Sequence, residues 1–216
     1  MRYPLLVFDW DGTIMDSIPR IIQVAQAAFE AVGFEPIGPE RIRPFIGLNV
    51  FDFIDRLMPE FDKEAQKTFF LAYRELWRSE RFAMAEPFEG VLQSLESLRQ
   101  AGYRLAVATG KSRAGLDREM HYHQMGWLFE KTCCADETKA KPDPTMLWDV
   151  LRHCVVDAEA SLVIGDSEFD IQMARNAGVH SVGVTTGCLS QSELSGLGAN
   201  HVLESVNHLQ AWLQDK

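Results

Sequence analysis

Six short runs of mainly apolar residues recur along the chain, and stretches with apolar residues at helical spacing separate most of them. The short runs predict strands that are buried on both faces, and the spaced stretches predict amphipathic helices. Strands that alternate with helices form a parallel sheet, so we predict an α/β fold with a Rossmann-like, doubly wound core. The predicted strands are Leu5–Phe8, Arg104–Ala108, Thr132–Ala135, Leu162–Ile164, Ser181–Val184 and His201–Leu203, and the helices lie near residues 88–101, 112–125, 143–153, 168–177 and 206–214.

The interval between the first two predicted strands is much longer than a simple βαβ unit of about 30 residues requires. Residues 17–83 have helical spacing throughout, and the first of these helices is broken by Gly33, Pro36, Gly38 and Pro39. The helical pattern stops at residues 86–90, where the chain re-enters the core. We therefore expect a small all-helical cap domain of residues 16–86, inserted into a core domain of residues 1–15 and 87–216.

The composition sets limits on compartment and partners. The chain has 216 residues, 46% of them hydrophobic, and a formal net charge of −10, which argues against nucleic acids and anionic membranes as partners. No apolar run approaches the length of a membrane span, and the first run is too short for a signal peptide. Four cysteines without metal-ligand spacing indicate free thiols in a reducing compartment. We expect a cytoplasmic monomer or homodimer that binds a small molecule.

The most informative motif directly follows the first predicted strand and reads Asp9-Trp10-Asp11-Gly12-Thr13. Side chains alternate along a strand, so the two aspartates point the same way from its carboxyl end. Two carboxylates that close repel each other unless a proton or a cation lies between them. One can then act as a nucleophile and the other as an acid/base beside Mg²⁺. The alternative interpretation is a solvated acidic turn.

Three further polar segments occupy comparable places. Residues 107–111 (VATGK) end the second strand, residues 141–144 (KPDP) open a helix, and residues 162–170 (LVIGDSEFD) end another strand. In this order, the four segments resemble the signature of the haloacid dehalogenase superfamily, and the phosphoglycolate phosphatase-like branch is the nearest match. The resemblance covers essentially the whole chain and implies the same helical cap at this point.

The resemblance assigns roles to the carboxylates. Asp9 is the candidate nucleophile, which would form an aspartyl-phosphate, and Asp11 is the candidate acid/base. The family-like Mg²⁺ ligands are the Asp9 carboxylate, the Asp11 backbone carbonyl and the Asp166 carboxylate. Asp170 lies one helical turn beyond Asp166, and we assign it to holding a metal-bound water. Compensation of the charge at a helix N-terminus is a serious alternative for Asp170.

Phosphate binding is assigned to a second group of residues. Thr109 and Gly110 lie between a strand and a helix, where a hydroxyl and backbone N–H groups can cradle a phosphate. A simple helix cap is the alternative for Thr109. Lys141 would neutralise the phosphate and the nucleophile, with Lys139 as a nearby competitor. Lys111 is less certain and would only flank the phosphate.

Substrate specificity is expected from the cap, because the core motifs handle only the phosphate. Arg41, Arg43 and Gly47 surround a loop, and similar Arg…Gly loops reach the active site in the branch that this chain resembles. Arg43 could bind a carboxylate or a second phosphate of the substrate. The alternative interpretation is a solvated surface arginine. Arg74 is a weaker candidate.

The function implied by the resemblance is Mg²⁺-dependent hydrolysis of a small phosphorylated metabolite, with phosphoglycolate as the default and sugar phosphates or nucleotides as alternatives. A phosphosugar mutase would use the same core residues, and a non-catalytic binding module on this fold is the other class. Dehalogenation is disfavoured because those relatives lack the second aspartate, Asp11. A phosphonate hydrolase would need a cap lysine, and the cap has only Lys63 and Lys67, both away from the Gly47 loop.

Overall fold

The core of the protein is a parallel sheet of six strands in the order β3-β2-β1-β4-β5-β6. The computed structural model describes residues 2–215. The predicted α/β class and each predicted strand are confirmed, with strand ends that shift by one residue at most. The strands are β1 (Leu5–Phe8), β2 (Arg104–Thr109), β3 (Lys131–Cys134), β4 (Ser161–Gly165), β5 (His180–Val184) and β6 (His201–Leu203).

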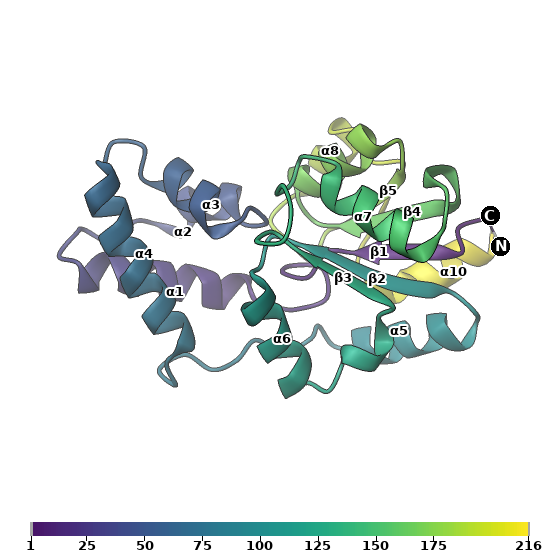
Figure 1. Ribbon diagram of the computed structural model, residues 1–216, viewed down its shortest axis with the longest axis horizontal. Coiled ribbons are helices and arrows are strands. Elements are labelled where there is room, and N and C mark those ends of the chain that lie inside the picture. Colours follow the sequence, from purple (N-terminus) through teal and green to yellow (C-terminus); the bar gives the residue numbers. More distant parts are fainter. Residues whose placement is uncertain (1, 216) are drawn as a thin grey trace.

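Helices cover both faces of this sheet, because alternate residues of each strand point to opposite sides (Figure 1). Leu6 and Phe8 of β1 belong to a hydrophobic cluster with one set of helices, and Leu5 and Val7 belong to a second cluster with another set. The first face carries α5 (Val91–Gln100), α6 (Arg113–Tyr122) and α10 (Leu209–Gln214), and the second carries α7 (Thr145–Cys154) and α8 (Glu168–Ala177). The short helix α9 (Gln191–Gly196), which the sequence pattern did not predict, packs near β5 and β6.

The strand order places a crevice beside β1. The chain runs outward from β1 to β2 and β3 on one side, and β4, β5 and β6 continue on the other side. In doubly wound sheets, ligands bind at the carboxyl ends of the strands where the order reverses. The ends of β1, β2 and β4 therefore define the place where a site is expected.

The helices after β1 pack into a hydrophobic cluster of their own, seen as the left-hand lobe in Figure 1. Residues 32–38, 46–49 and 58–62 of this lobe lie outside regular helices, so the prediction of helix throughout residues 17–83 was too broad. Asn49 and Asp62 begin two of the helices, each by accepting hydrogen bonds from backbone N–H groups of the first turn. The helices are α1 (Ile18–Ala31), α2 (Pro39–Ile42), a 3₁₀ turn (Arg43–Phe45), α3 (Val50–Leu57) and α4 (Lys63–Arg78).

The chain passes between the two lobes through adjacent segments. Met15 forms an antiparallel bridge with Pro87, and the Asp16 N–H donates to the Glu86 carbonyl at 2.9 Å. We propose that the cap comprises residues 16–86, because its cluster is separate from the two sheet clusters apart from two core residues that pack with it, Phe169 of α8 and the partly buried Cys188. This division stays a prediction.

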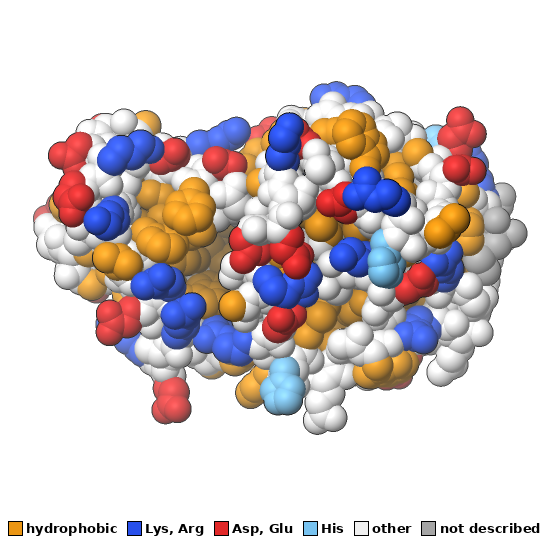
Figure 2. Space-filling view, viewed as in Figure 1, with side chains coloured by type: hydrophobic (Ala, Val, Ile, Leu, Met, Phe, Trp, Pro, Cys, Tyr) orange, Lys and Arg blue, Asp and Glu red, His pale blue; other side chains and the backbone are white. Residues whose placement is uncertain are grey.

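Charged side chains are spread over the face shown in Figure 2, whereas hydrophobic side chains gather on the cap lobe. The exposed apolar residues of the cap include Phe51 and Leu71. Within residues 2–215, the structure has no helix that is both long and apolar enough to cross a membrane. The four cysteines are free thiols, as predicted.

Candidate active site

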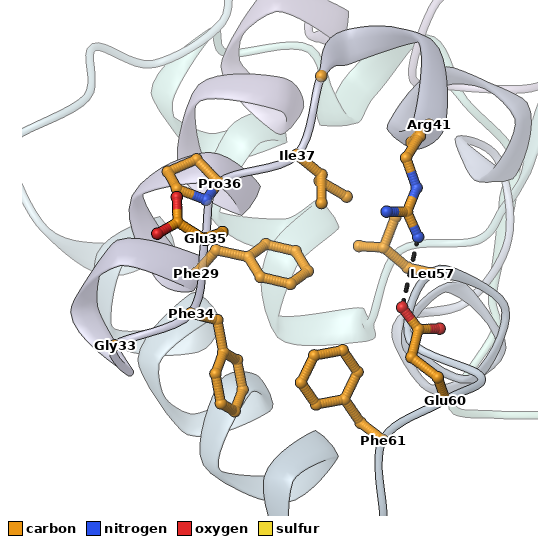
Figure 3. Close-up of a pocket in the computed structure, with 11 residues that line it drawn as sticks. Phe29, Gly33, Phe34, Glu35, Pro36, Ile37, Arg41, Leu57, Glu60 and Phe61 are labelled. Carbon is orange, nitrogen blue, oxygen red and sulfur yellow. Dashed lines mark ion pairs between the residues drawn. The ribbon is translucent and has the colours of Figure 1, made fainter.

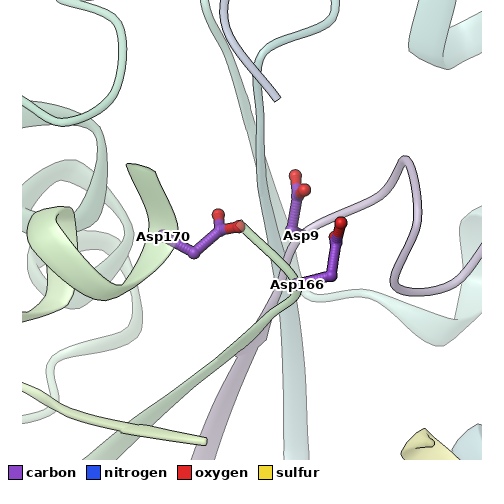
Figure 4. A group of neighbouring side chains, drawn as sticks. All are labelled: Asp9, Asp166 and Asp170. Atoms are coloured by element: carbon purple, nitrogen blue, oxygen red, sulfur yellow. The ribbon is translucent and has the colours of Figure 1, made fainter. Parts of the chain in front are cut away.

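Three aspartates meet at the carboxyl edge of the sheet. Asp9 follows β1, Asp166 follows β4, and Asp170 lies in the first turn of α8. Each offers a carboxylate oxygen, and these oxygens lie within 4.8 Å of one another (Figure 4). All three side chains are buried, so water cannot screen their mutual repulsion.

Lys141 is the cation buried among these carboxylates. Its Nζ donates to Asp9 Oδ1 at 2.7 Å and to Asp170 Oδ1 at 2.5 Å, and its side chain has no exposed area. The competing Lys139 is 74% exposed and pairs with Asp143. The structure therefore places Lys141, and not Lys139, at the predicted site.

Asp170 has two sets of partners. Its Oδ1 accepts from Lys141, and its Oδ2 accepts from the N–H and the hydroxyl of Ser167 in a capping box that begins α8. The alternative of a helix N-terminal role thus holds in part. Because both of its oxygens are engaged, Asp170 is better suited to orienting Lys141 than to binding a metal ion directly.

The charges of this group do not balance. With all three carboxylates ionised, the single ammonium would leave two excess negative charges in a buried space. Burial and the charge of Asp170 raise the pKa of Asp9 to about 7, against the opposing effect of Lys141. Burial and the charge of Asp9 likewise raise the pKa of Asp166 well above its ordinary value. A divalent cation would balance the charge, and a donor set of oxygen atoms suits Mg²⁺.

Two carboxylate oxygens of this group remain available to a ligand. Asp9 Oδ2 is buried and has no hydrogen-bond partner among residues 2–215. Asp166 is held through Oδ1, which accepts from the Thr13 hydroxyl at 2.7 Å. Asp9 Oδ2 and Asp166 Oδ2 can therefore face a metal ion or a phosphate. Whether the Asp11 carbonyl joins them stays a prediction.

Glycines crowd around Asp166, and the sequence analysis missed one of them. A Cβ on Gly12, whose φ is +79°, would lie 2.5 Å from Asp166 Oδ2, and a Cβ on Gly187 would overlap the same oxygen. Thr186 fixes this contact, because its hydroxyl donates to the Gly12 carbonyl at 2.6 Å. The loop after β5 is thus part of the site. The available signal was a Thr-Thr-Gly sequence directly after a predicted strand.

Thr109 is the last residue of β2, and Gly110 directly follows it, as the strand-end position predicted. Thr109 is fully buried, and its hydroxyl accepts from the Lys111 N–H at 3.2 Å. Helix α6 begins only at Arg113 and is capped by Ser112, so the alternative that Thr109 caps a helix is wrong. Thr109 is instead a strand-end hydroxyl beside the crevice.

Gly110 also permits a close contact that the sequence analysis did not predict. A Cβ at Gly110 would lie 2.5 Å from the carbonyl oxygen of Gly47 in the cap. A Cβ at Gly47, whose φ is +103°, would lie 3.0 Å from the Ser167 hydroxyl. The Gly47 loop therefore lies against the carboxyl edge of the core, and two glycines allow this close approach.

The acid/base candidate, Asp11, lies outside the group of three aspartates. Its Oδ1 accepts from the Ser17 hydroxyl at 2.5 Å and lies 3.0 Å from Lys111 Nζ. Lys111 Nζ also lies 3.1 Å from Oε1 of Glu119, a fully buried residue of α6. Burial lowers the pKa of Lys111, but Asp11 and Glu119 outweigh this effect and the net shift is upward. The sequence analysis missed Glu119.

The arginine candidates of the cap differ in position. Arg43 is exposed and lines a cavity of about 400 Å³ together with Asp166, Ser167 and Cys188. Arg41 forms an exposed pair with Glu60 at 3.5 Å, away from this cavity. Arg74 is exposed on α4 and stacks on the Phe70 ring. The structure thus brings Arg43, but neither of the others, toward the aspartates.

A larger cavity of about 580 Å³ lies within the cap (Figure 3). Aromatic rings of Phe29, Phe34 and Phe61 point into it, and the Arg41–Glu60 pair lies at its side. None of the strand-end residues of the core lines it. The cap cavity is therefore separate from the group of aspartates at the edge of the sheet.

Comparison with known proteins agrees with the predicted resemblance. Residues 6–184 match the model of the family described as haloacid dehalogenase-like hydrolase. A phosphoglycolate phosphatase of Vibrio cholerae is 30% identical over 191 residues, which cover 85% of this chain and 84% of that protein. A phosphoglycolate phosphatase of Agrobacterium fabrum is 29% identical over 85% of this chain and 81% of its own length.

Solved structures agree in fold. A predicted phosphoglycolate phosphatase from Haemophilus somnus superposes with a TM-score of 0.90 at 20% identity, over 99% of both chains. A protein assigned as a β-phosphoglucomutase from Bacteroides vulgatus gives 0.83 at 23% identity, over 98% of this chain and 88% of that chain. At this identity the likeness concerns the fold alone. The family match spans most of the chain, and the protein therefore belongs to the haloacid dehalogenase-like hydrolase family.

Proposed function

We propose that this hydrolase cleaves the phosphate monoester of a small metabolite in a Mg²⁺-dependent reaction, through an aspartyl-phosphate on Asp9. The observation that carries the proposal is the unequal state of the two Asp9 oxygens. Lys141 holds Oδ1, whereas Oδ2 is buried without a partner among residues 2–215. An oriented carboxylate with one available oxygen in a water-poor crevice suits a nucleophile.

The residues around Asp9 support two successive steps. Asp9 Oδ2 attacks phosphorus as the bond to the leaving oxygen breaks, and Asp11 donates the proton that this oxygen needs. Asp11 then takes a proton from the water that cleaves the aspartyl-phosphate, which releases inorganic phosphate and restores the Asp9 carboxylate and the protonated Asp11.

Positive charge and N–H donors assist both steps. Lys141, Thr109 and the N–H of Gly110 would bind the phosphate oxygens. Asp9 and Asp166 would hold Mg²⁺, which supplies charge that offsets the carboxylates and the phosphate. Asp170 would keep Lys141 oriented.

Phosphoglycolate is the substrate that we expect first, because named phosphoglycolate phosphatases match this chain over most of their length. The position of the Gly47 loop against the core edge favours a small substrate over a macromolecule. Sugar phosphates and nucleotides stay as alternatives.

The test is a panel of purified phosphate esters incubated with the protein and Mg²⁺, read as release of inorganic phosphate. We expect turnover of at least one small ester, with phosphoglycolate among the best. A phosphosugar mutase would convert its sugar phosphate into an isomer without net phosphate release. A binding module would turn over none of the esters, and this result would contradict the proposal.

Replacing Arg43 by alanine is expected to change substrate preference. Arg43 lines the same cavity as Asp166, which places it beside the proposed metal and phosphate site. The variant should lose about 1.5–3 kcal/mol of charge-assisted hydrogen bonding to phosphoglycolate, roughly a ten- to hundredfold fall in kcat/KM. Hydrolysis of an aryl phosphate whose leaving group carries no charge should be preserved.

Arg41→Ala provides the matched control, because Arg41 is an exposed cap arginine paired with Glu60. Equal losses with both esters would show that Arg43 acts on the fold or on cap closure. If neither ester is affected, specificity resides elsewhere in the cap.

A further inference from the structure

Glu119 is a buried charge that the proposed reaction does not explain. It lies on α6 with no exposed area, at a position where a helix packed on a sheet ordinarily has an apolar residue. Its Oε2 accepts from the Trp10 indole N–H at 2.7 Å, and its Oε1 lies 3.1 Å from Lys111 Nζ. Trp10 stands between Asp9 and Asp11 in the sequence and is itself fully buried. Burying a carboxylate is costly unless it is paired with a cation. We therefore expect Glu119 to hold the Lys111 ammonium in a fixed position.

Lys111 in turn contacts the proposed acid/base. Its side chain is only 9% exposed, and its Nζ lies 3.0 Å from Asp11 Oδ1. The Ser17 hydroxyl donates to the same oxygen. The described contacts of the Asp11 carboxylate thus fall on Oδ1, and they leave Oδ2 to face the reaction.

The third neighbour of Lys111 belongs to the cap. Lys111 Nζ lies 4.7 Å from the centre of the Trp77 ring, at the end of α4, and Arg20 of α1 lies over the same ring at 4.4 Å. The Trp77 carbonyl accepts from Arg20 at 2.9 Å and from Arg118 of the core helix α6 at 3.0 Å. Figure 1 shows α6 on the side of the core nearest the cap. Lys111 therefore contacts Asp11, the buried Glu119 of the core and Trp77 of the cap at the same time.

We infer that Lys111, held by Glu119 and by the ring of Trp77, is a positioning residue that orients Asp11 for proton transfer while the cap lies against the core. The inference rests on the proposed function, because it assigns the proton transfer to Asp11. It differs from a role for Lys111 in phosphate binding, since within residues 2–215 its ammonium contacts Asp11, Glu119 and an aromatic face.

The test compares two esters that differ in their need for a proton. An alkyl phosphate such as phosphoglycolate has a poor leaving group and requires a general acid, whereas p-nitrophenyl phosphate releases a stable anion. The parameter is kcat/KM, which reports the first phosphoryl transfer. In Glu119→Gln and Lys111→Met, we expect at least about a tenfold fall for the alkyl ester, part of the 10²–10⁴-fold that a positioned acid contributes. The aryl ester should change less than about threefold.

A second signature comes from the later step. If Asp11 is misplaced, cleavage of the aspartyl-phosphate slows, so both variants should release a rapid burst of nitrophenol before a slower steady rate. Trp77→Leu should give the same pattern more weakly. Asp11→Asn is the reference variant, and adding Glu119→Gln to it should cause little further loss, because both changes act through one carboxylate.

Lys139→Met is the control for removal of a lysine, because Lys139 is an exposed lysine of the core that pairs only loosely with Asp143. If Glu119→Gln fails to fold, Lys111→Met and Trp77→Leu still decide the matter, since both residues lie at the cap–core boundary. Equal falls in kcat/KM with both esters and no burst would overturn the inference and favour a structural or phosphate-binding role. A wild-type protein that hydrolyses neither ester would overturn the proposed function itself.

Discussion

Replacing Asp9 by asparagine is expected to reduce turnover of every ester by on the order of 10⁴-fold or more, the size of loss seen when an enzyme loses its nucleophile. Asparagine keeps the shape of the side chain and an oxygen that can accept from Lys141, but it cannot attack phosphorus. The change also removes one of three buried carboxylates that repel one another, so the fold should be retained. Steady-state phosphate release and a thermal melt measure the two effects.

Asp157→Asn is the matched control for this change, because Asp157 is an exposed aspartate of the core. It should keep the wild-type rate. Appreciable turnover in purified Asp9→Asn protein would contradict the assignment of the nucleophile.

Replacing Asp166 by asparagine is expected to weaken Mg²⁺ binding and to lower activity at least about a hundredfold at limiting Mg²⁺, because even outer partners of a metal site are worth about ten- to a hundredfold in affinity. A chelator should silence the wild-type enzyme reversibly, and Mn²⁺ should substitute for Mg²⁺.

The same variant gives a readout that does not depend on activity. Mg²⁺ at about 100 times its Kd should stabilise the wild-type fold by about 2.7 kcal/mol, or about 2–4 °C in Tm for each kcal/mol in a chain of this size. Without metal, Asp166→Asn should melt no lower than the wild type, because it relieves repulsion between buried carboxylates. A wild-type protein that keeps its rate and its Tm in chelator would contradict the metal site.

Much of the core was predictable from the sequence for a physical reason. Strands buried on both faces are apolar throughout, so the apolar runs around Leu5 and Leu162 could be predicted as strands. The polar residues that follow each run could then be placed at the strand ends. Parallel strands then bring their carboxyl ends to one edge, which is why the sequence pattern alone could assign Asp9, Thr109 and Asp166 to one crevice.

The contacts that cross between distant segments were not predictable in this way. Glu119 lies in a helix whose charged pattern reads as an exposed face, and only the packing of α6 beneath Trp10 reveals its burial. Gly187 belongs to a loop with no periodicity, and its role depends on how closely that loop approaches Asp166. The same holds for Gly110, whose contact with the Gly47 loop depends on how the cap lies against the core.

The helical prediction for the cap was too broad for a related reason. Apolar residues at helical spacing continue across the turns near Ile46 and Phe61, where they pack on the cap cluster without being helical. Spacing alone reports which residues are buried, whereas capping residues such as Asn49 report where a helix begins. The exact boundaries of the cap stay a prediction.

The most direct test is to trap the covalent enzyme with phosphate-labelled p-nitrophenyl phosphate and Mg²⁺ in Asp11→Asn protein, where its breakdown should be slow. After acid quenching and proteolysis, we expect the label on the peptide that contains Asp9, and we expect none when Asp9→Asn is added. A label on any other residue, or one that persists without Asp9, would contradict phosphoryl transfer through this carboxylate.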